Sequence, residues 1–372
     1  MTLILVWFFL ALAPSSSGST GASCICTGPH TQWQPCFFDV PDVSCAGASA
    51  SPSAAPLRTI LLWQGFRDDL AFVYRDPALL RCSHRCRFTD DRSLLARADA
   101  LLFSLIYLEP AHLPLAKASP NQAWIAHCGE SPTNYFGRNL RRPVMQRFDL
   151  HATISDSAHV RFNYLSFDLF GDRTLARLLA PPPDLASKTG LVVWLASNCN
   201  APRQDYVAQL MQHMRVDNHG DCLRNMPVDE QAGRRQPDWQ QRKIDLIATY
   251  RFVLAFENSV ADNYVTEKFY HAFLARTVPI FMGTSNVHRF APSNDSYIDV
   301  ARFASARDLA EHLLALSNDR EQYLALHAWR ERPIARAFLQ LAEESLNTVP
   351  CRVCEAVHSW TNGRTSAQHS EL

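Results

Sequence analysis

The chain lacks net charge, internal repeats and an apolar run long enough to cross a membrane. Its 36 basic and 36 acidic residues balance, so no strong field favours nucleic acid or an anionic membrane as a partner. The apolar run at residues 2–13 is shorter than the roughly 20 residues that a membrane-spanning helix needs. The 372 residues suffice for two domains of ordinary size, each with its own core.

Both ends of the sequence indicate the secretory pathway. Residues 1–22 combine an apolar stretch with small residues, as a signal peptide does, although the basic start of such a peptide is absent. A short retained anchor is the alternative, and only that would attach the chain to a membrane. The tail at residues 351–372 ends in HSEL, similar to the HDEL type of retention signal. We therefore expect the endoplasmic reticulum lumen, with the Golgi as the alternative.

Eleven cysteines fit an oxidising compartment. Residues 23–56 are rich in Cys, Ser and Pro and predict a disulfide-tied stem, while Cys128 is the expected unpaired thiol because the total is odd. Zinc is the alternative for the stretches at residues 82–86 and 351–358, where Cys and His have ligand-like spacing. The disulfide candidates are Cys82, Cys86, Cys199, Cys222, Cys351 and Cys354. Asn294 begins the sole N-glycosylation sequon.

Apolar runs alternate with helix-like stretches in both halves of the chain. In residues 57–180 we expect strands at 59–63, 100–104, 124–127 and 148–154 and a helix at 93–98. The proline run at residues 181–183 marks a hinge, because it can continue neither a helix nor a central strand. In residues 188–350 we expect a strand at 191–196, a polar loop at 233–238, and helices at 204–214, 241–249, 305–316 and 321–329. This alternation predicts an α/β protein with two Rossmann-like domains facing across a cleft.

The most informative stretch runs from residue 251 to 283. An apolar strand (252–256), a polar loop (257–264), a helix opening at Thr266 and a second apolar strand (278–282) predict a βαβ unit. Glu267 and Lys268 then lie on the first helical turn, where free N–H groups and a partial positive charge suit a phosphate. Charged residues at a helix start are more often only solvated surface, so the pattern alone leaves a ligand role open.

The residue letters narrow the choice. F-E-N-S followed by Y-V-T-E-K and V-P-I-F-M-G resembles the donor-binding signature of glycosyltransferase family 10, the α1,3-fucosyltransferases. The resemblance is sharp there and around Glu130 and Arg203, and looser over residues 82–354. It implies the GT-B fold, with an acceptor domain at 57–180 and a GDP-fucose domain at 188–350. The implied reaction is inverting transfer of L-fucose from GDP-β-L-fucose to an N-glycan, through an α1,3 link to GlcNAc, or to a glycoprotein.

Transfer from a nucleotide sugar requires compensation of the charge on the departing diphosphate. Many such enzymes use a metal held by Asp-x-Asp, which this sequence lacks. We therefore expect side chains and helix ends to compensate the charge, with no required cofactor and divalent-metal stimulation left open. Lys268 is one candidate. The resemblance implies that Arg203, which follows a Ser-Asn-Cys loop, contacts the donor phosphate, and an arginine can do so with two prongs.

The polar loop adds further donor candidates at the carboxyl end of its strand, where ligands bind in open α/β sheets. By the resemblance, Glu267 holds the nucleotide ribose, and Tyr264 stacks on the donor or hydrogen-bonds it. Asn258 and Glu257 lie in the same loop. Glu257 could instead hold the loop through backbone hydrogen bonds.

The expected strand at 124–127 leads into Glu130, Ser131 and Pro132, and the resemblance implies that Glu130 is the general base of a single in-line displacement. A plain turn at the strand end is the alternative reading of these three residues. Gly129 stands where the family often has a bulky or polar residue. Asn134 and Tyr135 are near enough to help bind an acceptor.

Three other functions compete with this one. A glycosidase, which needs two carboxylates, would explain Glu130 but not Arg203 or Lys268. A catalytically silent, lectin-like lumenal relative would keep the fold and lose the turnover. A protein O-fucosyltransferase of the endoplasmic reticulum would act on Ser or Thr of folded domains. The HSEL end and the run from Gly220 to Asn225, which resembles members outside the Lewis-antigen group, favour that last alternative without settling it.

Overall fold

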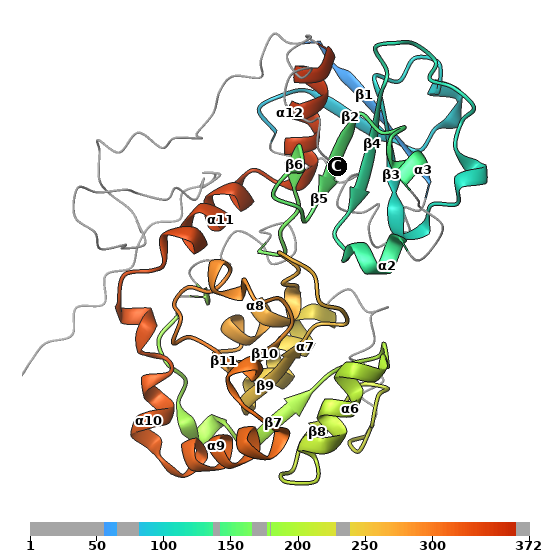
Figure 1. The fold of residues 1–372 in the computed structure, drawn as a ribbon. Helices are drawn as coiled ribbons and strands as arrows, with labels where there is room; N and C mark the ends of the chain where they lie inside the picture. The colour runs from blue at the N-terminus through green and yellow to red at the C-terminus, as the bar shows by residue number, and fades with distance from the viewer. Residues whose placement is uncertain are drawn as a thin grey trace, which may run out of the picture.

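A computed structural model describes residues 56–64, 82–136, 142–165, 177–178, 180–227 and 239–361. The expected signal peptide, nearly all of the stem, the polar loop at 233–238 and the HSEL end lie outside these residues. Within them, the strands form two separate sheets, one in each lobe of the molecule (Figure 1). We call them the first and the second lobe in chain order.

The first sheet has the strand order β2-β1-β3-β4-β5-β6, and all of its neighbouring strands are parallel. Because both faces of a parallel sheet are covered, its central strands are mostly apolar, as in the fully buried run Ala100–Ser104. Alternate side chains face opposite sides, so Ile60 and Leu61 belong to different cores. The strands are β1 (Arg58–Gln64), β2 (Cys86–Thr89), β3 (Ala100–Ser104), β4 (Ala123–Cys128), β5 (Leu150–Thr153) and β6 (Val160–Arg161).

The second sheet has the order β11-β10-β9-β7-β8 and is also entirely parallel. Its order reverses between β7 and β9, because β8 lies on the far side of β7. This reversal is the point at which open α/β sheets bind ligands. The strands are β7 (Gly190–Trp194), β8 (Asp217–Asn218), β9 (Tyr250–Phe256), β10 (Val278–Met282) and β11 (Ile298–Asp299).

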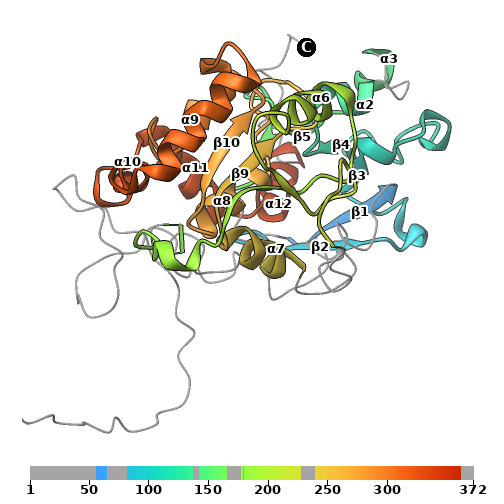
Figure 2. The same ribbon diagram turned by 90° about the horizontal axis from the view of Figure 1, so that it is seen from below.

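Helices cover both faces of the second sheet. Side chains of α7, α8 and α11 form the core on one face, and those of α6, α9 and α10 form the core on the other (Figure 2). The helices are α2 (Pro132–Phe136), α3 (Arg142–Met145), α6 (Ala201–Leu210), α7 (Trp239–Ala248), α8 (Glu267–Leu274), α9 (Ala306–Asn318), α10 (Arg320–Ala325), α11 (Arg336–Leu346) and α12 (Val349–Thr361). The 3-10 helices are η1 (Arg92–Leu94), η2 (Leu105–Tyr107), η3 (Pro110–His112), η4 (Leu185–Ser187), η6 (Val287–Arg289), η7 (Val300–Arg302) and η8 (Ala328–Glu331).

The last helix, α12, returns to the first lobe (Figure 1). Val349, Val353 and Val357 recur every four residues, which places them on one helix face, and all three are buried in a core of the first sheet. The tail expected from residue 351 therefore begins inside a packed helix. The first lobe contains both an early and a late part of the chain.

Three disulfides hold described segments together. Cys82–Cys351 and Cys86–Cys354 fasten α12 to the start of β2, and Cys199–Cys222 joins the loop after β7 to the segment after β8. Cys128 is buried and free, and burial raises the pKa of its thiol to about 12. The zinc alternative involves sulfur atoms that are bonded to each other here, although Cys86, Cys354 and His358 do lie close together.

Candidate active site

The loops after β7 and β9 meet at the strand-order reversal of the second sheet. Asn200, the N-cap residue of α6, donates from Nδ2 to the backbone oxygen of Asn258 at 2.6 Å. Gly220 makes a close approach possible on the β7 side, since a Cβ atom there would lie 2.2 Å from the Ala196 oxygen. The Cys199–Cys222 disulfide fixes the same loop. The edge at which a nucleotide is expected is therefore rigidly built.

Arg203 lies at this edge, with only 3 % of the residue exposed. Its Nη1 atom donates to the backbone oxygen of Phe256 at 3.0 Å, and Nη2 donates to the backbone oxygen of Asn198. Nε is buried without a hydrogen-bond partner among the described residues. Burial lowers the pKa of Arg203, and the neighbouring Glu257 offsets part of that effect. The guanidinium thus joins the ends of β7 and β9.

Glu257 holds the start of α8. Its carboxylate is buried and accepts from Thr266, from the backbone N–H at 2.7 Å and from the hydroxyl at 2.9 Å. Because Thr266 is the N-cap residue of α8, the carboxylate compensates the free donors of a helix start. Burial raises the pKa of Glu257 despite the nearby Lys268 ammonium. Of the two roles expected for Glu257, these contacts are those of a loop-holding residue.

Lys268, on the first turn of α8, lies between the carboxylates of Glu257 and Glu267. Its Nζ atom is 3.2 Å from Glu257 Oε2 and 3.6 Å from Glu267 Oε1, and it donates to the Thr266 hydroxyl at 2.8 Å. Burial lowers the pKa of Lys268, but attraction to Glu257 and Glu267 outweighs burial, so the net shift is upward. Lys268 is therefore a fixed positive charge beside Glu257. Arg203 binds the preceding residue, Phe256, so the two cations lie at the same end of β9.

Glu267 is held by two cations. Lys243 on α7 lies 3.6 Å from its Oε1 atom, the same distance as Lys268. Burial raises the pKa of Glu267, yet attraction to Lys268 and Lys243 more than compensates and leaves a net lowering. The carboxylate therefore stays ionised at neutral pH and can accept hydrogen bonds from hydroxyl groups.

Glu130 contacts, from the first lobe, the polar loop at residues 257–264 of the second lobe. We call this segment the donor loop, because the donor is expected there. Glu130 follows β4, and its Oε2 atom accepts from the hydroxyl of Tyr264 at 2.6 Å and from Asn134 Nδ2 at 2.8 Å. Asn134 also donates to Asn258 Oδ1 at 3.4 Å. Burial raises the pKa of Tyr264 well above its usual value, so the phenol keeps its proton and donates it to the carboxylate. These contacts bring the two lobes together at Glu130.

Gly129, which precedes Glu130, is packed against the aromatic residues Phe162 and Tyr164. A Cβ atom on Gly129 would lie 2.6 Å from the ring of Phe162, so the aromatic ring occupies the space that a larger residue would take. The hydroxyl of Tyr164 donates to the backbone oxygen of Gly129 at 3.0 Å. Phe162 and Tyr164 pack edge to face. Glycine here is thus matched to this aromatic pair.

Two local features near the site were not foreseen from the sequence. Helix α6 begins at Ala201 instead of near residue 204, so Arg203 lies inside its first turn. Tyr135, expected near the acceptor, is only 5 % exposed and packs in the core of the first lobe. Four residues that contact the site were missed: Tyr164, Asn200, Lys243 and Thr266. Only Thr266 had a local signal, as the residue that opens the helix.

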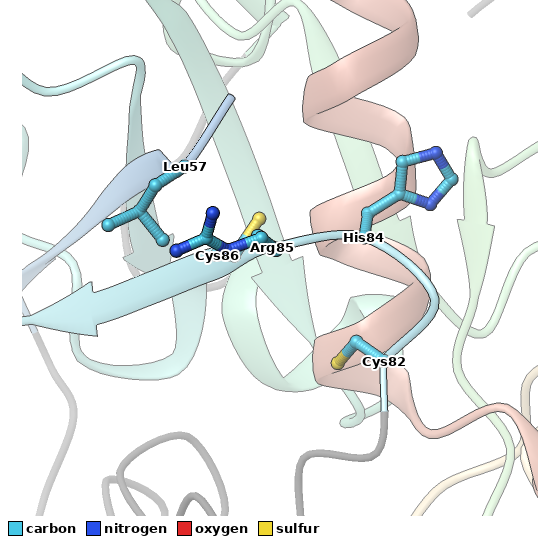
Figure 3. A pocket seen from close by; sticks show the side chains of 5 residues that line it. All are labelled: Leu57, Cys82, His84, Arg85 and Cys86. Atoms are coloured by element: carbon cyan, nitrogen blue, oxygen red, sulfur yellow. The ribbon is translucent and has the colours of Figure 1, made fainter. Parts of the chain in front are cut away.

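A separate cavity of about 240 Å³ lies at the opposite edge of the first sheet (Figure 3). Its lining residues are Leu57, Cys82, His84, Arg85 and Cys86. Cys86 begins β2, whereas Glu130 follows the end of β4, and all strands of this sheet run in the same direction. The cavity is therefore not part of the Glu130 site. Within the described ranges, no helix has the length and apolar character that crossing a bilayer requires.

Comparison with solved structures shows which fold the two lobes form. A crystal structure of an α1,3-fucosyltransferase with GDP matches with a TM-score of 0.57 at 17% identity, over 84% of this chain and 94% of that chain. A structure with GDP-fucose matches with a TM-score of 0.56 at 16% identity, over 88% and 96% of the two chains. The two parallel α/β lobes therefore form a GT-B fold, as the sequence predicted.

Family models and sequence relatives place the chain more closely. The model described as glycosyltransferase family 10 (fucosyltransferase) C-term matches residues 185–370, and fucosyltransferase, N-terminal matches residues 55–165. Human 4-galactosyl-N-acetylglucosaminide 3-alpha-L-fucosyltransferase FUT5 is 30% identical over 90% of this chain and 86% of its own length. The chain belongs to glycosyltransferase family 10, the fucosyltransferase family, which confirms the resemblance.

A second group of relatives differs in length. GDP-fucose protein O-fucosyltransferase 3 of Bos taurus and of Homo sapiens are each 32% identical over 66% of this chain and 52% of their own length. The chain thus spans about half of these relatives.

Proposed function

We propose that this chain is an inverting fucosyltransferase that moves L-fucose from GDP-β-L-fucose to an acceptor hydroxyl. The observation that carries the proposal is the contact between the Glu130 carboxylate of one lobe and the donor loop of the other. A base must lie within hydrogen-bond reach of the proton that it removes. We place the acceptor between the first lobe, called the acceptor lobe from here on, and the second lobe, called the donor lobe. Its hydroxyl then lies within reach of Glu130.

Glu130 acts as the general base. Tyr264 and Asn134 both bind Oε2, so we assign Oε1 to the acceptor hydroxyl. As the acceptor oxygen forms its bond to C1 of fucose, the hydroxyl proton passes to Glu130. The bond between C1 and the β-phosphate oxygen breaks, and GDP leaves with that electron pair. A single displacement of this kind inverts the configuration at C1 and needs no covalent intermediate.

The donor lobe compensates the charge of the departing diphosphate. Lys268 and Arg203 flank the end of β9, and their fixed charges act without reorganisation when charge develops on the leaving group. Glu267 accepts from the ribose hydroxyls, while Tyr264 and Asn258 line the sugar side. No cofactor is required in this account. Stimulation by a divalent metal is compatible with it, because a metal would add to the same charge compensation.

The acceptor we favour is a glycan, with an α1,3 link to GlcNAc, or a glycoprotein. The long coverage shared with the human FUT5 relative supports this choice. The alternative is Ser or Thr of a folded domain in the endoplasmic reticulum, which the identity to the protein O-fucosyltransferase 3 relatives favours. A glycosidase is disfavoured, because it would leave the cations Arg203 and Lys268 at the end of β9 without a role.

The compartment is proposed on the same basis. Three disulfides and an exposed Asn294 at the sequon are compatible with a secretory protein. We favour the endoplasmic reticulum lumen, with the Golgi as the alternative.

Product mass spectrometry tests the function. The chain is incubated with GDP-fucose and either N-glycan acceptors or folded-domain acceptors, and products are examined for the mass of one added fucose. Fucosylated glycan supports the favoured acceptor, and a fucosylated Ser or Thr supports the alternative. Binding of GDP with no product on either acceptor class would identify a catalytically silent, lectin-like relative and overturn the proposal.

A further inference from the structure

A second contact between the lobes lies on the other side of the donor loop. Arg289, the last residue of η6 in the second lobe, binds Asp156, which follows β5 in the first lobe. Its Nη1 and Nη2 atoms lie 2.7 Å and 3.2 Å from the two carboxylate oxygens. Two parallel bonds of this kind fix orientation as well as distance. We call Asp156 and Arg289 the interlobe pair.

Arg289 also binds the donor loop itself. Its Nη1 atom donates to Asn263 Oδ1 at 3.1 Å. Asn286 forms two hydrogen bonds with the same residue. Its Nδ2 atom donates to Asn263 Oδ1 at 3.0 Å, and its Oδ1 atom accepts from the backbone N–H of Asn263 at 3.2 Å. Asn263 is buried and has φ of 64°, in the left-handed region that is uncommon for non-glycine residues and in which Asn is enriched.

The residue after Asn263 is Tyr264, whose hydroxyl returns to the first lobe at Glu130. Glu130 follows β4 and Asp156 follows β5, and these strands are paired neighbours with Cys128 opposite Thr153. A closed circuit therefore runs from Asp156 through Arg289 to the donor loop, and from Tyr264 to Glu130. Its two ends, Glu130 and Asp156, follow adjacent strands of one sheet.

We propose that Asp156 and Arg289 are positioning residues for fucosyl transfer. The interlobe pair fixes the distance between the lobes and, through Asn263, the turn that aims Tyr264 at Glu130. Exposed ion pairs usually contribute little to stability, and the side chains of Arg289 and Asp156 are 38% and 49% exposed. The pair acts on the site through a third hydrogen bond, from Arg289 to Asn263, which links it to the donor loop. This inference rests on the proposed function, because it assigns a purpose to the orientation of Glu130.

The chain offers graded variants and a matched control. Arg289→Gln removes the charge and the fork, and Asp156→Asn removes the charge from the other side. Arg289→Lys keeps the charge, but its single ammonium cannot reproduce the fork geometry. The control is Arg332→Gln, which breaks the exposed Arg332–Asp295 pair at 2.9 Å within the second lobe.

Kinetics, GDP affinity and hydrogen exchange are measured on each folded variant. We expect Arg289→Gln to lower kcat about tenfold through misplacement of the reacting groups. The dissociation constant for GDP should change less than about twofold, because Arg203 and Lys268 are untouched. Deuterium uptake of residues 258–268 should rise, as the bonds to Asn263 are lost. The kcat and the deuterium uptake of Arg289→Lys should lie between those of Arg289→Gln and the wild type. Those of Arg332→Gln should equal the wild-type values.

The double variant Asp156→Asn/Arg289→Gln should lose less than the sum of the two single losses, because the two residues share one contact. Asp156 also pairs with Arg161 at 3.1 Å, and this contact is lost only in the variants that carry Asp156→Asn. Equal kcat in Arg289→Gln and wild type, with unchanged uptake of residues 258–268, would overturn the inference. Fully additive losses in the double variant would do the same. Deuterium uptake needs no turnover, so a wild type that transfers no fucose would count against the proposed function and not against the link to the donor loop.

Discussion

The hydroxyl of Tyr264 lies 2.6 Å from Oε2 of Glu130, although the two residues belong to different lobes and are 134 positions apart. This hydrogen bond connects the donor loop to the proposed base. It gives the carboxylate one fixed orientation, which is what catalysis by a preorganised group requires.

Loss of that hydroxyl should slow transfer more than it weakens donor binding. In Tyr264→Phe the ring stays and the bond to Glu130 is lost, so we expect kcat to fall about tenfold. GDP affinity should change less than about threefold, because the phosphate-binding side chains remain. The matched control is Tyr270→Phe, since the Tyr270 hydroxyl is buried without a hydrogen-bond partner among the described residues. Wild-type kcat in Tyr264→Phe would refute the orienting role.

Lys268→Ala should weaken both GDP binding and folding. The change removes a cation from the phosphate site and leaves the buried Glu257 carboxylate without its ion-pair partner. Removing one member of a buried pair costs about 3–5 kcal/mol of stability, and we expect GDP affinity to fall more than about tenfold. Calorimetric titration with GDP and urea unfolding measure the two effects. Lys268→Arg, which keeps the charge, should lose less on both, and undiminished GDP affinity in Lys268→Ala would exclude the phosphate role.

Chelation should leave transfer intact if side chains compensate the diphosphate charge. We expect the initial rate of fucose transfer to persist after treatment with EDTA and dialysis. Added Mn²⁺ or Mg²⁺ should stimulate the rate less than about threefold, as an ion would only supplement Lys268 and Arg203. Complete loss of activity that Mn²⁺ alone restores would contradict this charge assignment.

Lys188 should make stability depend on pH. Its Nζ atom is buried and donates to the backbone oxygen of Ala275 and to the Thr277 hydroxyl, and burial lowers its pKa to about 7. Between pH 7 and its ordinary pKa the unfolded chain binds the proton and the folded chain does not. Stability therefore rises with pH in that window. The effect is constant below pH 7, where both states are protonated.

Urea unfolding of wild type and Lys188→Met at pH 7 and pH 9 tests this linkage. The free energy of unfolding should rise by about 2 kcal/mol more in the wild type than in the variant over that interval. Comparison of the two proteins cancels the other groups that titrate there. Equal pH dependence in both would show that the Lys188 ammonium is not destabilised by burial.

The grouping of polar side chains around the start of α8 could be predicted from the sequence because it is local. Glu257, Glu267 and Lys268 lie within one βαβ unit, so strand, loop and helix periodicity are enough to place them together. Asn258 and Tyr264 belong to the same loop. The strand order, which creates the reversal between β7 and β9, follows from the crossover connections and is typical of such folds.

The contacts between distant segments could not be predicted in this way. No periodicity relates Tyr164 to Gly129 or Asp156 to Arg289, because these pairs meet only when both sheets have formed. The return of α12 to the first lobe was missed for the same reason. The burial of Tyr135 was not foreseen, because its position beside Asn134 in the sequence does not show that adjacent helical residues point in different directions.

Glu130→Gln is the most direct test of the account, because glutamine keeps the size of the side chain and an oxygen that can accept from Tyr264. Fucose transfer and calorimetric GDP binding are measured on the same preparation. We predict that kcat falls at least about a hundredfold, as expected for loss of a general base. The GDP dissociation constant should stay within about twofold of wild type. Transfer at the wild-type rate by Glu130→Gln would contradict the account.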